Sequence, residues 1–436
     1  MFRSIKRLFI LVTCLMLLLS CASGSFADEQ GMDTLPVKDM GGRVFRFGFS
    51  EVLDRDDYED WLLQLEKDYN CQIEIVNAGD LGSVAVSIKG GTPVADVITM
   101  DDTYFYKFVR QALLIDLAEL ENIYPMDTRY YWKSTQEAAT VDGKTYGVSC
   151  APGDWRRILM YNKDIVNGDD DLQMLAEKGE LTWEKLAEIL QRVAMSGKAG
   201  LVGQMYESDI LETFVVANGG RMFERNGLKF KCVYDSANSR NAIAFVQTLW
   251  NNGCLFENKG NWQYPQSQFA KGKAGVFIAD AWNMEYIYSK AKFDIGMVLM
   301  PMGPDSETPG AGLIEQTVFN CYSIPITAEN PEDVALVLSA FVKAQAEAGY
   351  GKESWRSTWG DIVDDEKNMK VLEAYAAAME AGGCFQDYKA AVTMLYVDGI
   401  YELQQDATKA KMSPQAYLET VIPIYEAKAA DFVTAE

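Results

Sequence analysis

The sequence predicts an α/β protein of two lobes, on three observations. Its 436 residues are more than one compact core usually holds, so two domains or lobes are expected. From residue 44 onward, apolar runs of strand length alternate with segments of helical periodicity, which is typical of a parallel sheet with crossover helices. A second series of strands and helices follows residue 142, and no internal repeat is visible.

The first series of elements can be assigned in order from its periodicity. The expected elements are a strand at 44–49, a helix at 57–69, a strand at 72–76, a helical or mixed segment at 83–89, a strand at 94–100 and a helix at 104–113. The run 94–100 is mostly apolar and is expected to form a continuous buried strand, as in a parallel sheet covered on both faces.

The second series is longer and ends in helices. We expect strands at 145–150, 158–161 and 274–279, helices at 183–193 and 239–251, and a turn with Asp280 and Trp282 followed by a helix and a strand ending at Met300. Glycine and proline crowd residues 303–312, which indicates a loop. A strand at 317–324, a helix at 331–344 and a mostly helical region at 366–434 complete the chain.

The N-terminus reads as an export leader. Three basic residues precede the apolar run 8–19, which is too short to span a bilayer and suits a signal peptide. Leu18-Leu19-Ser20-Cys21 resembles the bacterial lipobox, in which Cys21 would be lipidated, whereas Ser25-Phe26-Ala27 is an acceptable site for ordinary cleavage. Residues 1–27 are thus assigned to the leader and the start of a tether, and 28–41 to a flexible tether.

Charge and composition exclude several functions. The formal net charge is −23, and a surface this acidic repels nucleic acid and anionic lipid. The chain contains no histidine, so catalytic Ser-His-Asp and Cys-His pairs and histidine metal sites are excluded. We expect no metal and no cofactor.

Six cysteines lie beyond the leader and follow no metal or redox spacing. An even number in an exported protein permits disulfides, yet about 15 pairings are possible and buried free thiols are an equal alternative. These cysteines are Cys71, Cys150, Cys232, Cys254, Cys321 and Cys384.

A series of short motifs appears in a specific order along the chain. After the lipobox come GTPVADVI at 91–98, LLIDL at 113–117, DGKTYGV at 142–148, YNKD at 161–164, LTWEKL at 181–186 and FAKGKAGV at 269–276. In this order they resemble the family 1 extracellular solute-binding proteins of ABC importers, which include maltose- and oligosaccharide-binding proteins. The resemblance covers nearly all of the chain after residue 42.

The resemblance implies two α/β lobes, each a sheet flanked by helices, with a ligand cleft between them at a hinge. By position, the first lobe would contain residues 42–149 and about 316–360, and the second lobe 150–312 and about 361–436. The family also implies a monomer that closes on its ligand and presents it to the transmembrane subunits of a permease.

Trp282 is the first candidate for the binding site. Most tryptophans belong to cores, but this one follows a strand that is already filled by residues 275–279, where α/β proteins place ligands. In sugar-binding members of the family, an aromatic at the matching turn stacks on a pyranose ring, and neighbouring carboxylates such as Asp280 bind hydroxyl groups.

Carboxylates also follow the strands of the first lobe. Asp101 and Asp102 come directly after a buried strand, and we expect at least one of them to cap the following helix while the other faces ligand. Glu51 follows the first strand and is a candidate by the same argument.

The predicted hinge crossings supply the remaining candidates. Asp154 and Trp155 follow Ala151-Pro152-Gly153 in an irregular segment, so ligand binding and hinge packing are equally open to them. Glu315 is either a ligand carboxylate or a hinge hydrogen-bonding group. The adjacent arginines Arg156 and Arg157 have two alternatives, pairing with a ligand carboxylate or a structural salt bridge, and the salt bridge is expected.

The sequence therefore predicts a binding protein that performs no chemistry. It would capture a neutral carbohydrate, preferably an oligosaccharide, by lobe closure, and a neutral peptide or a polyol is left open as the ligand. Two alternatives remain open: a secreted glycoside hydrolase that works with a carboxylate pair, and a surface protein that senses a ligand and docks onto a membrane receptor. A hydrolase built on a barrel is disfavoured because no run of eight strand–helix units is present.

Overall fold

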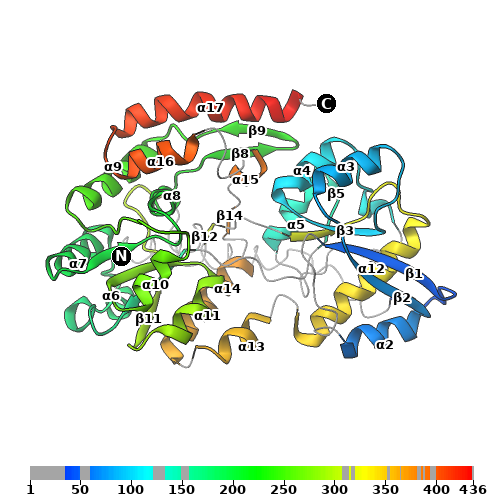
Figure 1. Cartoon of the computed structure of the whole chain (residues 1–436), viewed down its shortest axis with the longest axis horizontal. Coiled ribbons are helices and arrows are strands. Elements are labelled where there is room, and N and C mark those ends of the chain that lie inside the picture. Colours follow the sequence, from blue (N-terminus) through cyan, green and yellow to red (C-terminus); the bar gives the residue numbers. More distant parts are fainter. Residues whose placement is uncertain are drawn as a thin grey trace, which may run out of the picture.

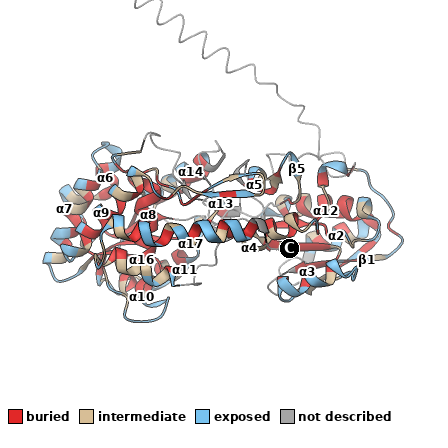
Figure 2. Cartoon of the chain, turned by 90° about the horizontal axis from the view of Figure 1, so that it is seen from above, coloured by how far each residue is buried: buried red, intermediate tan, exposed pale blue. Residues whose placement is uncertain are grey.

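The computed structural model describes residues 35–49, 59–120, 133–148, 157–306, 314–315, 320–350, 354–363, 365–380, 384–385, 388–392 and 399–434. These residues form two lobes, each built on a four-stranded sheet with helices packed against it (Figure 1). The helices on the outside of the molecule have one buried and one exposed face (Figure 2).

The sheet of the first lobe has the strand order β13-β3-β1-β2. Its strands are β1 (Arg43–Phe49), β2 (Cys71–Asn77), β3 (Val97–Asp101) and β13 (Asn320–Ser323). The first three run parallel, and β13 returns late in the sequence to pair antiparallel with β3. The helices of this lobe are α2 (Glu59–Tyr69), α3 (Leu81–Lys89), α4 (Asp102–Arg110), α5 (Lys133–Ala139) and α12 (Pro331–Gln345).

The sheet of the second lobe has the order β11-β6-β10-β7. Its strands are β6 (Ile158–Asn162), β7 (Ala199–Val202), β10 (Ala274–Ala279) and β11 (Ile295–Leu299). Strand β6 runs antiparallel to both β10 and β11, whereas β7 and β10 are parallel. All six residues of β10 are buried, so this strand forms the centre of the lobe.

Helices cover the second sheet on both faces and form the C-terminal part of the chain. They are α6 (Leu172–Glu177), α7 (Trp183–Met195), α8 (Glu207–Ala217), α9 (Ala237–Asn251), α10 (Tyr264–Ala270), α11 (Ala281–Lys290), α13 (Ser354–Gly360), α14 (Glu366–Glu380), α15 (Lys389–Val392), α16 (Ile400–Thr408) and α17 (Pro414–Thr434). Thr182 caps α7 as the sequence predicts, since its side chain accepts a hydrogen bond from the N–H of Lys185 at 3.2 Å.

The two lobes meet where a hairpin of the second lobe reaches α4 of the first (Figure 1). This hairpin pairs β8 (Phe223–Asn226) with β9 (Lys229–Cys232). The ring of Phe230 lies 5.5 Å from that of Tyr106 on α4. Arg225 packs over the same tyrosine at 5.1 Å and donates to the carbonyl oxygens of Glu137 at 3.2 Å and Thr140 at 3.1 Å. An aromatic and cationic contact therefore joins the lobes.

Some expected elements differ from the structure. Of the strand expected at 145–150, only Thr145 lies in a strand, β5 (Lys144–Thr145), which pairs with β4 (Thr140–Val141). Val148 forms an isolated bridge with Tyr322, and residues 149–150 lie outside the described residues. The helix expected at 104–113 ends at Arg110, where Ala112 takes a φ of 53° that breaks the helix.

The position of Trp355 bears on the lobe boundaries. Its side chain is buried in a hydrophobic cluster with residues of β10, β11 and α14, all in the second lobe, whereas α12 packs against α2 of the first. We therefore propose that the chain returns to the second lobe between α12 and α13, several residues before the expected position near 360.

Of the six cysteines, Cys71, Cys254 and Cys321 are free thiols in the part of the chain that the structure describes. Within the described ranges no group of three or more potential metal ligands comes together, and no helix there is long and apolar enough to span a membrane. The predicted leader with Cys21 lies outside the described residues.

Candidate functional site

The candidate site is built around the end of β10. Asp280 follows this strand and stands at the N-cap of α11, so that Trp282 lies in the first turn of a helix and not in an open turn. The indole of Trp282 is 39% exposed, which is high for so large an apolar side chain. The sequence prediction that Trp282 projects from the edge of the sheet therefore agrees with its position.

A second tryptophan stands beside the first. Trp262 lies in the loop before α10, is 43% exposed, and places its ring 5.6 Å from Trp282 at an interplanar angle of 63°. We call Trp262 and Trp282 the aromatic corner. Trp262 was not among the site residues predicted from the sequence. Its signal there is an isolated aromatic within the polar loop 257–263, next to the start of a helix.

Asp280 lies beneath the aromatic corner and not at its surface. Its side chain is fully buried, and its Oδ1 accepts a hydrogen bond from the backbone N–H of Arg157 at 3.1 Å. The guanidinium of Arg157 is 3.8 Å from the same oxygen, while the N–H of Asp280 donates to Asn283 Oδ1 at 3.0 Å. Asp280 thus holds the N-terminus of the helix that carries Trp282.

Helix α8 contributes three buried carboxylates to the interior of the same lobe. Glu207 Oε1 accepts the N–H of Asn258 at 2.9 Å and pairs with Lys409 Nζ at 3.2 Å. Because Asn258 lies in the loop that leads to Trp262, this bond anchors the loop that carries the second indole. Every residue of α8 is buried, so its acidic groups act inside the lobe.

The pKa values of the other two carboxyl groups of α8 are shifted in opposite directions. Burial raises the pKa of Asp209, although Arg157 is attractive and the N–H groups of Met205 and Tyr206 donate to Oδ2, both at 2.8 Å. Burial also opposes ionisation of Glu212, but Lys389 and Arg157 outweigh it and lower the pKa of that carboxyl below its usual value.

In the first lobe the two predicted aspartates occupy different environments. Asp101 ends β3 at the N-cap position of α4 and is partly exposed, but its side chain makes no capping hydrogen bond. Asp102 is fully buried in the first turn of α4. The expectation that one of them caps with its side chain is therefore wrong for Asp101, and burial keeps Asp102 from the surface. Of the two aspartates, Asp101 is the more exposed.

The remaining predicted site residues are described in part or not at all. Glu51, Asp154 and Trp155 lie outside the described residues. The backbone of Glu315 forms β12 (Ile314–Glu315), which pairs in parallel with β14 (Cys384–Phe385), while its side chain lies outside the description. Glu315 thus stands where two distant chain segments are joined by a short sheet.

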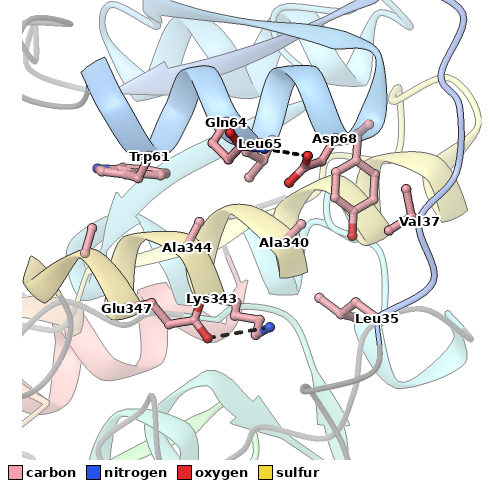
Figure 3. A pocket seen from close by; sticks show the side chains of 12 residues that line it. Leu35, Val37, Trp61, Gln64, Leu65, Asp68, Ala340, Lys343, Ala344 and Glu347 are labelled. Atoms are coloured by element: carbon pink, nitrogen blue, oxygen red, sulfur yellow. Dashed lines mark hydrogen bonds and ion pairs between the residues drawn. The ribbon is translucent and has the colours of Figure 1, made fainter.

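A separate groove of about 550 Å³ lies on the first lobe between α2 and α12 (Figure 3). Trp61 and Tyr69 line one side, Ala340 and Ala344 the other, and Leu35 closes one end. Among the predicted site residues that the structure describes, Asp101, Asp102, Asp280 and Trp282 do not line this groove.

Comparison with known families identifies the protein class. A family model described as bacterial extracellular solute-binding protein matches residues 51–350. The chain belongs to this family. This solute-binding protein is similar to the maltodextrin-binding protein MdxE of Bacillus subtilis (strain 168). The two are 27% identical over 205 residues, which is 44% of this chain and 46% of the relative. The chain thus matches about half the length of that curated relative.

Solved structures show the same two-lobed fold. The GacH receptor of Streptomyces glaucescens, solved unliganded and with acarbose and an acarbose homolog, matches with a TM-score of 0.61 and 14% identity, over 89% of this chain and 99% of the receptor. A cyclo/maltodextrin-binding protein complexed with maltotetraose matches with a TM-score of 0.64 and 15% identity, over 88% of this chain and 97% of the other. The predicted fold class is confirmed.

Proposed function

We propose that this solute-binding protein captures an oligosaccharide on the aromatic corner and delivers it to an ABC-type permease. The observation that carries the proposal is the pair of exposed indoles, Trp262 and Trp282, fixed at the end of a buried strand. Indole faces suit the C–H faces of sugar rings, and partly exposed aromatics are common in ligand sites that combine apolar and polar contacts.

The geometry of the corner favours more than one sugar ring. The two indole planes are inclined at 63°, so a single ring can stack on one of them but not on both. A bent chain of two or more linked rings can place successive rings on the two faces. The relatives known with acarbose and maltotetraose make a glucose-based oligosaccharide the natural first ligand to test.

The proposal extends to closure and location. A ligand on the corner would be met from the first lobe by the partly exposed Asp101, with Glu315 and the residues around 154–155 at the crossings. The protein would work as a monomer held to the membrane by lipid on Cys21, or free after cleavage at Ala27. Metabolic labelling with a palmitate analogue, lost in Cys21→Ser, tests the anchor.

Calorimetric titration of residues 28–436 with glucose, maltose and maltotetraose tests the function. We expect saturable binding that is stronger for maltotetraose than for glucose, and a rise in Tm, since a ligand at 100 times its Kd stabilises by about 2.7 kcal/mol. Reducing sugar should not accumulate during incubation. Turnover would favour the hydrolase alternative, and the absence of binding to all three sugars would refute the proposal.

A further inference from the structure

We propose that Arg157 is a positioning residue that links the C-terminal segment around α15 and α16 to the aromatic corner. Arg157 directly precedes β6 and is buried. Its backbone has a φ of 67°, a left-handed conformation that non-glycine residues adopt only when the surroundings impose it.

The strained backbone is held by the same group that binds the side chain. Both the backbone N–H of Arg157, at 3.1 Å, and its guanidinium, at 3.8 Å, approach Oδ1 of Asp280. An extended backbone at this residue would turn the N–H away from that oxygen. The conformation of Arg157 and the position of Asp280 are therefore set together.

The guanidinium also reaches a second buried carboxylate. It lies 3.8 Å from Glu212 Oε2 and donates to Gln204 Oε1 at 3.3 Å. Oε1 of Glu212 in turn forms an ion pair with Nζ of Lys389 on α15. The same oxygen accepts a hydrogen bond from the side-chain amide of Gln404 on α16 at 2.8 Å. Two cations from distant segments thus share one buried carboxylate, and the loss of either weakens the charge compensation of Glu212 in the interior.

Asp280 is also connected to the helices next to both tryptophans. It caps α11, whose residue Asn283 donates to Gln266 Oε1 of α10 at 2.8 Å. Helix α10 begins two residues after Trp262, and α11 carries Trp282. A displacement of Arg157 is therefore expected to move the two helices and to change how the two indoles meet.

A buried ion pair that merely stabilises the lobe would have a different consequence. Its loss would lower the Tm while the folded protein kept the same aromatic corner. A positioning role predicts a changed corner in protein that is still folded. The affinity part of this distinction rests on the proposed sugar binding, but the conformation of Trp282 can be measured without ligand.

The test uses Arg157→Met, Arg157→Lys and the control Arg192→Met, which removes a half-exposed arginine paired with Asp170. The emission of Trp282 is obtained by subtracting the spectrum of the same variant carrying Trp282→Phe. We expect Arg157→Met to shift this emission and to weaken maltotetraose binding roughly tenfold, the lysine variant to be intermediate, and the control to match wild type.

Unchanged Trp282 emission in folded Arg157→Met would overturn the inference, even if its Tm falls. If that variant does not fold, Arg157→Lys and Glu212→Gln decide in its place: a shift of emission in both supports the link, and wild-type emission in both refutes it. Failure of the wild type to bind maltotetraose would refute the proposed function alone, because the emission measurements need no sugar.

Discussion

Replacing Trp282 with alanine tests the proposed site most directly. An indole side chain has about 250 Å² of surface. With 39% of Trp282 exposed, roughly 100 Å² is available to a ligand. At about 25 cal/mol per Å², covering this surface contributes about 2.5 kcal/mol, and covering half of it about 1.2 kcal/mol. Trp282→Ala should therefore raise the Kd for maltotetraose roughly 8- to 60-fold.

The fold should tolerate this change. Trp282 is exposed in the first turn of α11, and alanine is the best helix former, so the Tm should change little. Calorimetric titration measures the Kd, with Met195→Ala as control because Met195 is 82% exposed at the end of α7 of the same lobe. An unchanged Kd in folded Trp282→Ala would show that the sugar does not lie on the aromatic corner.

Three further predictions concern the interior. Gly296→Ala places a Cβ about 2.1 Å from the buried ring of Tyr161, so the free energy of unfolding should fall by about 1–3 kcal/mol. Thermal unfolding measures this, and an unchanged Tm would contradict the packing. Burial raises the pKa of Asp209 above its unfolded value of about 4, so its ionisation destabilises the fold as the pH rises from there. The Tm of Asp209→Asn minus that of wild type should therefore increase as the pH is raised from about 4, and a difference that stays constant with pH would refute this. Burial raises the pKa of Cys71 to about 11 and that of Cys321 to about 12, so mass spectrometry should find both alkylated at pH 8 roughly 100-fold or more slower than in unfolded protein.

Strands and helices with a clear period were predictable from the sequence. The expected strand 274–279 coincides with β10, because six consecutive small or apolar residues followed by a capping aspartate have few other solutions. Segments whose conformation depends on distant contacts were less predictable. The expected strand at 145–150 is interrupted where Gly147 lies so close to Cys321 that a Cβ would come within 2.7 Å of its sulfur.

The site shows the same division. Trp282 could be found because it directly follows a buried strand, and local sequence is enough to place it near the edge of the sheet. Its companion Trp262 is twenty positions earlier, and only the packing of α10 on α11 brings the two rings together. Asp280 was expected at the surface, but Arg157, which is more than a hundred residues away in sequence, approaches it in the interior.

By itself, the sequence determined the α/β class, the two lobes and the family, because periodicity and ordered motifs are local properties that survive without knowledge of contacts. Tertiary structure alone decided which polar groups are buried and which aromatic rings meet. A carboxylate such as Glu212 becomes a structural centre only when Arg157 and Lys389 arrive from separate segments, since the free energy of a buried charge depends on its partners in space. The aromatic corner around Trp282 is likewise a property of the packed lobe.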